Sequence, residues 1–201
     1  MQLNPTATRV FERLIADLER SGNRDYHGAY AAHFKWLVLL LCRFVQTRAD
    51  AVGRKYPYLA RIEDGLTPLE SALQEDLEEF LIGFGMPQAE RSGVTAGRAD
   101  LYLPQPSRQP FRFVIEVKRH LTAWADDVCE PFLRQTTAYQ QTDLKLGILA
   151  VLDLSDRPSG VPDFEECFWV AVRRVSGRDI RHAVVVRVPG NKRTPSDHAE
   201  P

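Results

Sequence analysis

The stretch that decides the fold is Phe111-Arg112-Phe113-Val114-Ile115-Glu116-Val117-Lys118. Its residues alternate as in a strand, and the apolar face carries Phe111, Phe113, Ile115 and Val117. Glu116 and Lys118 share the opposite face, because successive strand side chains point to opposite sides. A carboxylate beside an amine makes a compact polar site, although an E-x-K triplet alone also fits an ordinary solvent-exposed ion pair.

The surrounding segments predict an α/β fold. Helices are expected at residues 5–22, at 28–50, from Thr67 to about residue 84, and at about 124–142. Further strands are expected at residues 88–95, 100–103, 146–152, 168–172 and 183–188. The helix at Thr67 has a strong start signal, with Thr at the N-cap, Pro68 at the first helical position and Glu70 closing a capping box.

Composition indicates a globular domain. The chain has 201 residues, a net charge of −1, 44% hydrophobic and 26% charged residues. Cys42, Cys129 and Cys167 are far apart and no signal peptide precedes them, which favours reduced thiols in the cytoplasm. The apolar run from Trp36 to Val45 is shorter than the ~20 residues that span a bilayer, so we expect a buried helix and no membrane partner.

Asp100 adds a second carboxylate to the site. A hairpin through residues 104–110 would bring Asp100 beside Glu116. Two adjacent carboxylates repel each other unless one is protonated or a cation binds both. Hard oxygen ligands suit Mg²⁺ or Mn²⁺, which can activate water and polarise a phosphodiester. Lys118 is then placed to orient that water or to stabilise developing negative charge.

These residues carry a family resemblance. Asp100 followed by Glu116-Val117-Lys118 resembles the D…E-x-K signature of the PD-(D/E)XK, or restriction-endonuclease-like, nucleases, with Ala99 in place of the proline. Gln135-Thr136-Thr137-Ala138-Tyr139 resembles the Q-x-x-x-Y helix of the RecB-like branch, and positions i and i+4 share a helix face. Tyr139 as a core aromatic and Gln135 as a surface amide is the structural alternative.

Glu70 is the best candidate for a further carboxylate from the upstream helix. It lies near the centre of the apolar stripe, whereas Glu75 and Glu79 lie opposite that stripe. Glu70-x-x-Leu73-Gln74 also resembles the E-x-x-L-Q pattern of related nucleases. The capping box offers a purely structural alternative for Glu70.

The resemblance implies a restriction-endonuclease-like core, α-β-β-β-α-β, with a mixed central sheet flanked by helices. It would occupy residues 67–190, after an N-terminal helical region at 1–66 packed on the core and before a flexible tail at 191–201. It implies metal ligation by Asp100, Glu116, Glu70 and Val117, with Gln135 and Tyr139 completing the catalytic set. Three flanking arginines are candidates for phosphate contacts: Arg98, Arg119 and Arg134.

The expected function is therefore a Mg²⁺-dependent or Mn²⁺-dependent nuclease acting on DNA, in prokaryotic genome defence or repair by family analogy. One alternative is a catalytically silent module that keeps the fold and binds nucleic acid. Another is an assembly subunit that forms a homodimer or a larger complex through the N-terminal helices. Loss of cleavage on substitution of Asp100 or Lys118 would separate the enzyme from both.

Overall fold

The computed structural model describes residues 2–49, 51, 55–62, 65–86, 98–103, 111–125, 127–139, 145–158, 160–177 and 179–193. For residues 98–103, 111, 112, 138 and 139 it describes the backbone alone. The strand expected at 88–95 lies outside the described residues, as does the side chain of Asp100.

In the described part of the chain, a mixed sheet of five strands forms the centre, with strand order β1-β2-β3-β5-β4. The strands are β1 (Arg98–Leu103), β2 (Phe111–His120), β3 (Leu146–Asp153), β4 (Phe168–Ser176) and β5 (Asp179–Pro189). β2, β3 and β5 run parallel, whereas β1 and β4 pair antiparallel at the two edges. The predicted α/β class with a mixed sheet is confirmed.

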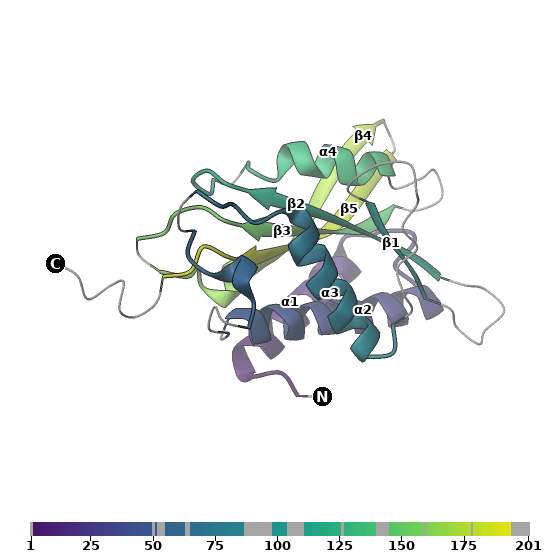
Figure 1. The fold of residues 1–201 in the computed structure, drawn as a ribbon. Helices are drawn as coiled ribbons and strands as arrows, with labels where there is room; N and C mark the ends of the chain where they lie inside the picture. The colour runs from purple at the N-terminus through teal and green to yellow at the C-terminus, as the bar shows by residue number, and fades with distance from the viewer. Residues whose placement is uncertain are drawn as a thin grey trace.

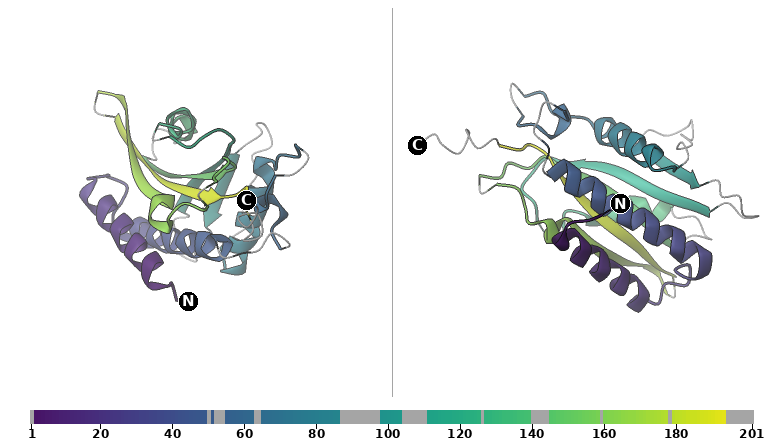
Figure 2. Two further views of the ribbon diagram at one scale, coloured as in Figure 1. Left: turned by 90° about the vertical axis from the view of Figure 1, so that its left-hand side faces the viewer. Right: turned by 90° about the horizontal axis from the view of Figure 1, so that it is seen from below.

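Four α-helices in the described chain cover the sheet in two layers (Figure 1). They are α1 (Pro5–Arg20), α2 (Gly28–Ala49), α3 (Glu70–Gly83) and α4 (Glu130–Tyr139), with short 3₁₀ turns at Pro57–Leu59 and Phe164–Cys167. Figure 2 shows α1 and α2 side by side beneath one face and α4 above the other. Both faces of β3 are therefore covered, and all eight of its residues are buried.

Each face of the sheet has its own apolar cluster. Ile115, Val117 and Ile148 pack toward α1, α2 and α3 in the larger cluster. Leu149 and Val151 pack toward Leu133 of α4 in the smaller one. Since Glu116 pairs with Leu149 in the parallel ladder, Glu116 belongs to the α4 face of the sheet.

The helix α2 carries the longest apolar stretch. Its buried residues include Phe34, Leu37, Leu41 and Val45, which belong to the larger cluster. By length and composition α2 is also apolar enough to cross a membrane, a property that buried core helices share. In the structure it packs on α1, α3 and β5.

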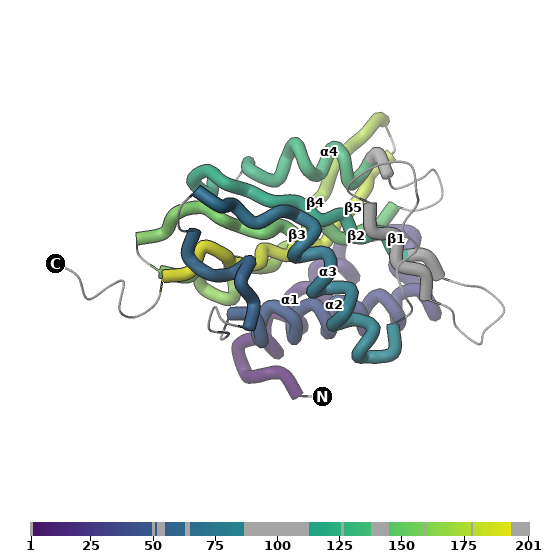
Figure 3. Tube along the Cα trace, in the orientation of Figure 1, coloured from purple at the N-terminus to yellow at the C-terminus, as the bar shows by residue number. Residues whose placement is uncertain are grey.

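The helix α3 begins at Glu70, so the predicted start at Thr67 and Pro68 is wrong. Leu69 is the N-cap, with extended backbone and no capping hydrogen bond from its side chain. The reason is tertiary: Arg119 Nη1 of β2 donates to the carbonyl of Pro68 at 3.1 Å. This contact holds the residues before Glu70 alongside β2, and Glu70 closes no capping box. Figure 3 shows the chain running beside β2 on its way into α3.

A buried arginine ties α3 to α2. Arg48 donates to both carboxylate oxygens of Asp76, through Nε at 2.8 Å and through Nη2 at 2.5 Å. Its guanidinium also lies over the rings of Phe44, Tyr56 and Phe80. A two-point pair of this kind fixes direction as well as distance, so it orients the helix that carries Glu70.

The ordered chain extends past the expected end of the domain at residue 190. Asn191 Oδ1 accepts from the N–H of Ile62 at 2.9 Å, and Lys192 N–H donates to the carbonyl of Leu59 at 3.1 Å. Residues 191–193 are thus anchored on the segment between α2 and α3, and residues 194–201 lie outside the described residues.

Stability is expected to depend on pH through His182. Burial lowers its pKa, and its Nδ1 lies 2.8 Å from Nδ2 of Asn23, an amide nitrogen that can only donate. The folded ring is therefore neutral at Nδ1. Since the folded pKa is below the unfolded value of about 6.5, the contribution of His182 is fully present above that value and is lost as the pH falls below it.

The urea midpoint should therefore drop between about pH 7.5 and about pH 5.5. His182→Gln should flatten this dependence, and His27→Gln, at an exposed histidine, should leave it unchanged. Equal slopes for His182→Gln and the wild type would contradict this origin.

Candidate active site

The site is built on the second half of β2. In the antiparallel ladder, position 100 of β1 pairs with Val114 and position 98 pairs with Glu116. Cross-strand partners share a face, so position 100 belongs to the same face of the sheet as Glu116 and Lys118. The backbone register therefore puts position 100 on the expected face, but the position directly opposite Glu116 is 98 and not 100. Whether the Asp100 and Glu116 carboxylates converge stays a prediction.

Glu116 and Lys118 form a buried ion pair. Lys118 Nζ lies 2.5 Å from Glu116 Oε1. Glu116 is 0% exposed and Lys118 is 7% exposed, which excludes the solvent-exposed pair that the E-x-K triplet also allowed. Replacing a buried ion pair by apolar side chains is often neutral or even stabilises a protein by about 1–4 kcal/mol. A contribution to the stability of the fold is therefore a weak explanation for the presence of this buried ion pair.

Glu70 enters the site from α3. Its Oε2 lies 3.9 Å from Lys118 Nζ, and its Oε1 accepts from the backbone N–H of Arg119 at 3.3 Å. The structure thus brings Glu70 to Lys118, whereas Glu75 and Glu79 of the same helix are exposed. The Lys118 ammonium is shared by two carboxylates from different elements.

The helix α4 lies over the same face. It begins at Glu130, later than the predicted 124, and it contacts β2. Gln135 is half-buried on this helix, and its neighbours Thr136 and Thr137 are buried. Tyr139 is the last residue of α4, and its side chain lies outside the described residues.

The three predicted phosphate-binding arginines have different surroundings. Arg119 is half-buried and held by the carbonyl of Pro68. Arg134 is exposed on α4, and the side chain of Arg98 is not among those described. Arg119 contacts Glu70 through its backbone N–H, while its guanidinium is held at the Pro68 carbonyl, because alternation along β2 directs its side chain away from the face that carries Lys118.

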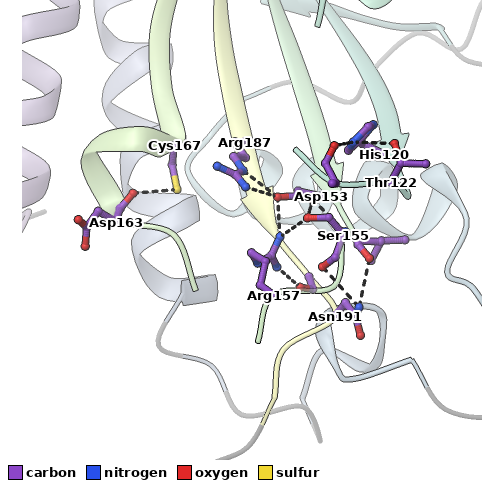
Figure 4. Close-up of polar contacts among 12 residues, drawn as sticks. His120, Thr122, Asp153, Ser155, Arg157, Asp163, Cys167, Arg187 and Asn191 are labelled. Atoms are coloured by element: carbon purple, nitrogen blue, oxygen red, sulfur yellow. Dashed lines mark hydrogen bonds and ion pairs between the residues drawn. The ribbon is translucent and has the colours of Figure 1, made fainter. Parts of the chain in front are cut away.

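A second polar cluster lies at the C-terminal end of β3 (Figure 4), and the sequence analysis missed it. Asp153 is fully buried, and its Oδ1 accepts from the N–H of Ser155 at 3.0 Å and from its hydroxyl at 2.6 Å. Its Oδ2 accepts from Arg157 Nη1 at 2.5 Å and from Arg187 Nε at 2.7 Å. Arg157 also donates to the carbonyl of Gly190. We call these four residues, Asp153, Ser155, Arg157 and Arg187, the Asp153 cluster.

The Asp153 cluster shares a face with the Glu116 and Lys118 pair. Lys118 pairs with Val151 in the ladder, and Val151 pairs with Arg187. The guanidinium of Arg187 lies 4.1 Å from the ring centre of Trp124, in the segment that leads to α4. A carboxylate that ends a wholly apolar strand was the sequence signal for this cluster, because such strand ends are where α/β sheets place polar residues.

Oxygen ligands for a metal are available from two described carboxylates, Glu116 and Glu70. Together with Asp100 and the backbone carbonyl of Val117 they would form the hard donor set that Mg²⁺ takes. Among the side chains that the structure describes, no group of three His, Cys, Asp or Glu residues converges as a metal site. That search did not extend to the side chain of Asp100.

The candidate site thus contains the buried ion pair of Glu116 and Lys118, and the Glu70 carboxylate lies near the same ammonium. The helix α4, which carries Gln135, covers this face of the sheet. Comparison with protein-family models, with curated proteins and with solved structures yields no match to this chain.

Proposed function

We propose that this chain is a divalent-metal-dependent nuclease that hydrolyses phosphodiester bonds in DNA. The observation that carries the proposal is the fully buried Glu116 carboxylate, 2.5 Å from Lys118 Nζ, with Glu70 3.9 Å from the same nitrogen. The order α3, β1, β2, α4, β3 supports a restriction-endonuclease-like core, with position 100 on the shared face.

The donor set fits a hard cation. Glu116 and Glu70 supply carboxylate oxygens from β2 and α3, and Asp100 and the Val117 carbonyl are the further ligands that the resemblance implies. When bound, Mg²⁺ or Mn²⁺ would supply Lewis-acid polarisation of a phosphate oxygen and lower the pKa of a bound water.

The side chains of the site have separate roles in the proposed reaction. Lys118 donates hydrogen bonds and a positive charge where negative charge develops on the phosphoryl oxygens. Glu70, 3.9 Å from the same nitrogen, is a second carboxylate that would help to hold the Lys118 ammonium. Gln135, on α4, would orient the substrate phosphate, and Arg119, whose backbone N–H contacts Glu70, would supply a cation at the edge of the site.

The first experiment is a cleavage assay on plasmid, linear duplex and single-stranded DNA with Mg²⁺, with Mn²⁺ and with EDTA. Cleavage that requires either metal and is lost in EDTA supports the proposal. Binding of nucleic acid without cleavage under every metal condition would favour the catalytically silent module instead.

Glu70 and Glu75 provide a matched pair on one helix. Glu70→Gln is expected to reduce metal-dependent cleavage by about ten- to a hundredfold, because it weakens the hold on Lys118 and removes one oxygen donor. Glu75→Gln, at an exposed position of α3, should leave the rate unchanged. Initial rates at several Mg²⁺ concentrations measure both, and equal rates for the two variants would remove Glu70 from the site.

A further inference from the structure

A row of three side chains runs along β2 on the face of the sheet that α4 covers: Glu116, Lys118 and His120. Alternation puts them on one side of the strand, with neighbours about 6–7 Å apart. Trp124 packs in the apolar cluster of that face, and its ring centre lies 5.4 Å from that of His120, so the imidazole is on the α4 side as well. Glu116 is 0% exposed, Lys118 is 7% exposed and His120 is half-buried. The row therefore leads from the buried ion pair towards solvent and ends on an imidazole.

The imidazole of His120 is held in one orientation. Its Nε2 lies 3.3 Å from the carbonyl oxygen of Ala123 and 3.3 Å from the hydroxyl of Thr122 (Figure 4). A carbonyl oxygen can only accept, so Nε2 carries a hydrogen. The hydrogen bonds among the residues that the structure describes do not involve Nδ1. Nδ1 is therefore the ring nitrogen that remains for exchange of a proton with a ligand.

The Asp153 cluster supports this histidine through Trp124. The guanidinium of Arg187 lies 4.1 Å from the centre of the Trp124 ring, and Asp153 accepts from Arg187 Nε at 2.7 Å. The other contact of the Trp124 ring is edge-to-face with His120, at an interplanar angle of 86°. A buried ionic group thus fixes the ring against which His120 packs, which is the kind of support that a precisely placed functional side chain needs.

The leaving group of the proposed reaction needs a proton donor. Hydrolysis of a phosphodiester releases an alkoxide, which departs more readily when an acid protonates it. In the proposed site Glu116 and Glu70 would be ionised metal ligands, and Lys118 Nζ lies 2.5 Å from the first carboxylate and 3.9 Å from the second. Histidine is the side chain that most often transfers protons in enzymes, and His120 is the member of the row outside the ion pair.

We propose, on the basis of the nuclease function proposed above, that His120 is the general acid that protonates the leaving oxygen of the phosphodiester. As water forms a new P–O bond, the P–O bond to the leaving oxygen breaks and its electron pair stays on that oxygen. Nδ1 of the His120 imidazolium gives its proton to this oxygen. The proton lost by the attacking water passes to solvent, and the imidazole takes up a new proton from solvent.

A bridging sulfur in the substrate tests this role, because a thiolate leaves readily without protonation. The wild type is first used to map one cleaved linkage and its leaving oxygen in a DNA oligonucleotide, which is then made again with sulfur in place of that oxygen. His120→Gln should cut the oxygen linkage about a hundredfold more slowly than the wild type, and the sulfur linkage less than about threefold more slowly. His27→Gln, at an exposed histidine between α1 and α2, should cut both linkages at the wild-type rate.

The comparison of the two linkages separates proton donation from a structural role, which would slow both alike. A thermal melt verifies that His120→Gln is folded, and His120→Asn replaces it if it is not. Equal losses on the two linkages, or no loss on either, would overturn the role of His120, while metal-dependent cleavage by the wild type would leave the nuclease in place. A wild type that cuts no DNA with Mg²⁺ or Mn²⁺ removes both.

Discussion

Cleavage by the double variant Glu116→Leu/Lys118→Met is expected to fall at least about a thousandfold below the wild type while the protein stays folded. The reason lies in the burial of the pair: the substitutions remove both charges together and keep similar volumes. A buried pair replaced in this way commonly leaves the free energy of unfolding unchanged or raises it by about 1–4 kcal/mol. Metal-dependent cleavage and urea unfolding, measured on the same preparation, check the two halves of the prediction.

The single variants show whether the pair acts as a unit. Lys118→Met alone leaves the Glu116 carboxylate in a fully buried position without its lysine, so this variant should lose both activity and stability. Restoration of stability, but not of activity, when Glu116→Leu is added would identify the pair as functional. A double variant that cleaves at the wild-type rate would place the active site elsewhere.

Asp153→Ala is expected to lower the free energy of unfolding by roughly 3–5 kcal/mol, because it leaves buried arginines without their shared carboxylate. Arg187 is 6% exposed and donates to Asp153 at 2.7 Å, and Arg157 donates at 2.5 Å. Asp153 also binds the N–H and hydroxyl of Ser155. Equilibrium urea unfolding measures the loss, which should be among the largest of any single substitution outside the apolar clusters.

Asp156→Ala is the control for this effect. Asp156 pairs with Arg193 at 2.9 Å, but 67% of its side chain is exposed, so water replaces the lost contact. Both variants lose one carboxylate that binds arginine, but the Asp153 carboxylate is buried and the Asp156 carboxylate is exposed. Similar urea midpoints for both would show that the Asp153 cluster does not stabilise the fold.

The sequence predicted the elements whose residues repeat with a clear period. The strand Leu146–Asp153 is apolar throughout and is buried on both faces, as expected. The helix predicted at residues 5–22 from its apolar stripe forms at Pro5–Arg20, and the side chain of its N-cap, Asn4, accepts from the N–H of Ala7 at 2.7 Å. Such elements depend on local patterns of residues, so the amino-acid sequence alone is enough to predict them.

The parts that escaped prediction depend on contacts between distant residues. Thr67 and Pro68 carry the local signal for a helix start, yet Arg119, about fifty positions later, binds the Pro68 carbonyl and keeps that segment extended. The Asp153 cluster joins residues from β3, from the loop after it and from β5, and nothing in the spacing of these residues announces the contact. Tertiary hydrogen bonds decided both cases.

For the candidate site, the sequence favoured Glu70 over Glu75, and the structure brings Glu70 to Lys118 while Glu75 stays exposed. Helical periodicity sufficed because the apolar stripe of α3 faces the core beside β2. The burial of Glu116 could not be predicted in the same way, since an alternating strand carries no information on whether a helix will cover its polar face. The roles of Asp100, Gln135 and Tyr139 stay predictions for the variants to test.

The place of β5 in the sheet has a consequence for how the chain folds as it is made. β5 lies between β3 and β4 and packs against α2, although α2 is synthesised early and β5 is the last strand. A ribosome adds residues at about 5–20 per second, so the side of α2 that packs against β5 stays uncovered until β5 has been made. Nascent chains are therefore expected to be at greatest risk of aggregation before residue 189 emerges, and folding is expected to be slow, because the sheet closes through contacts of long sequence separation.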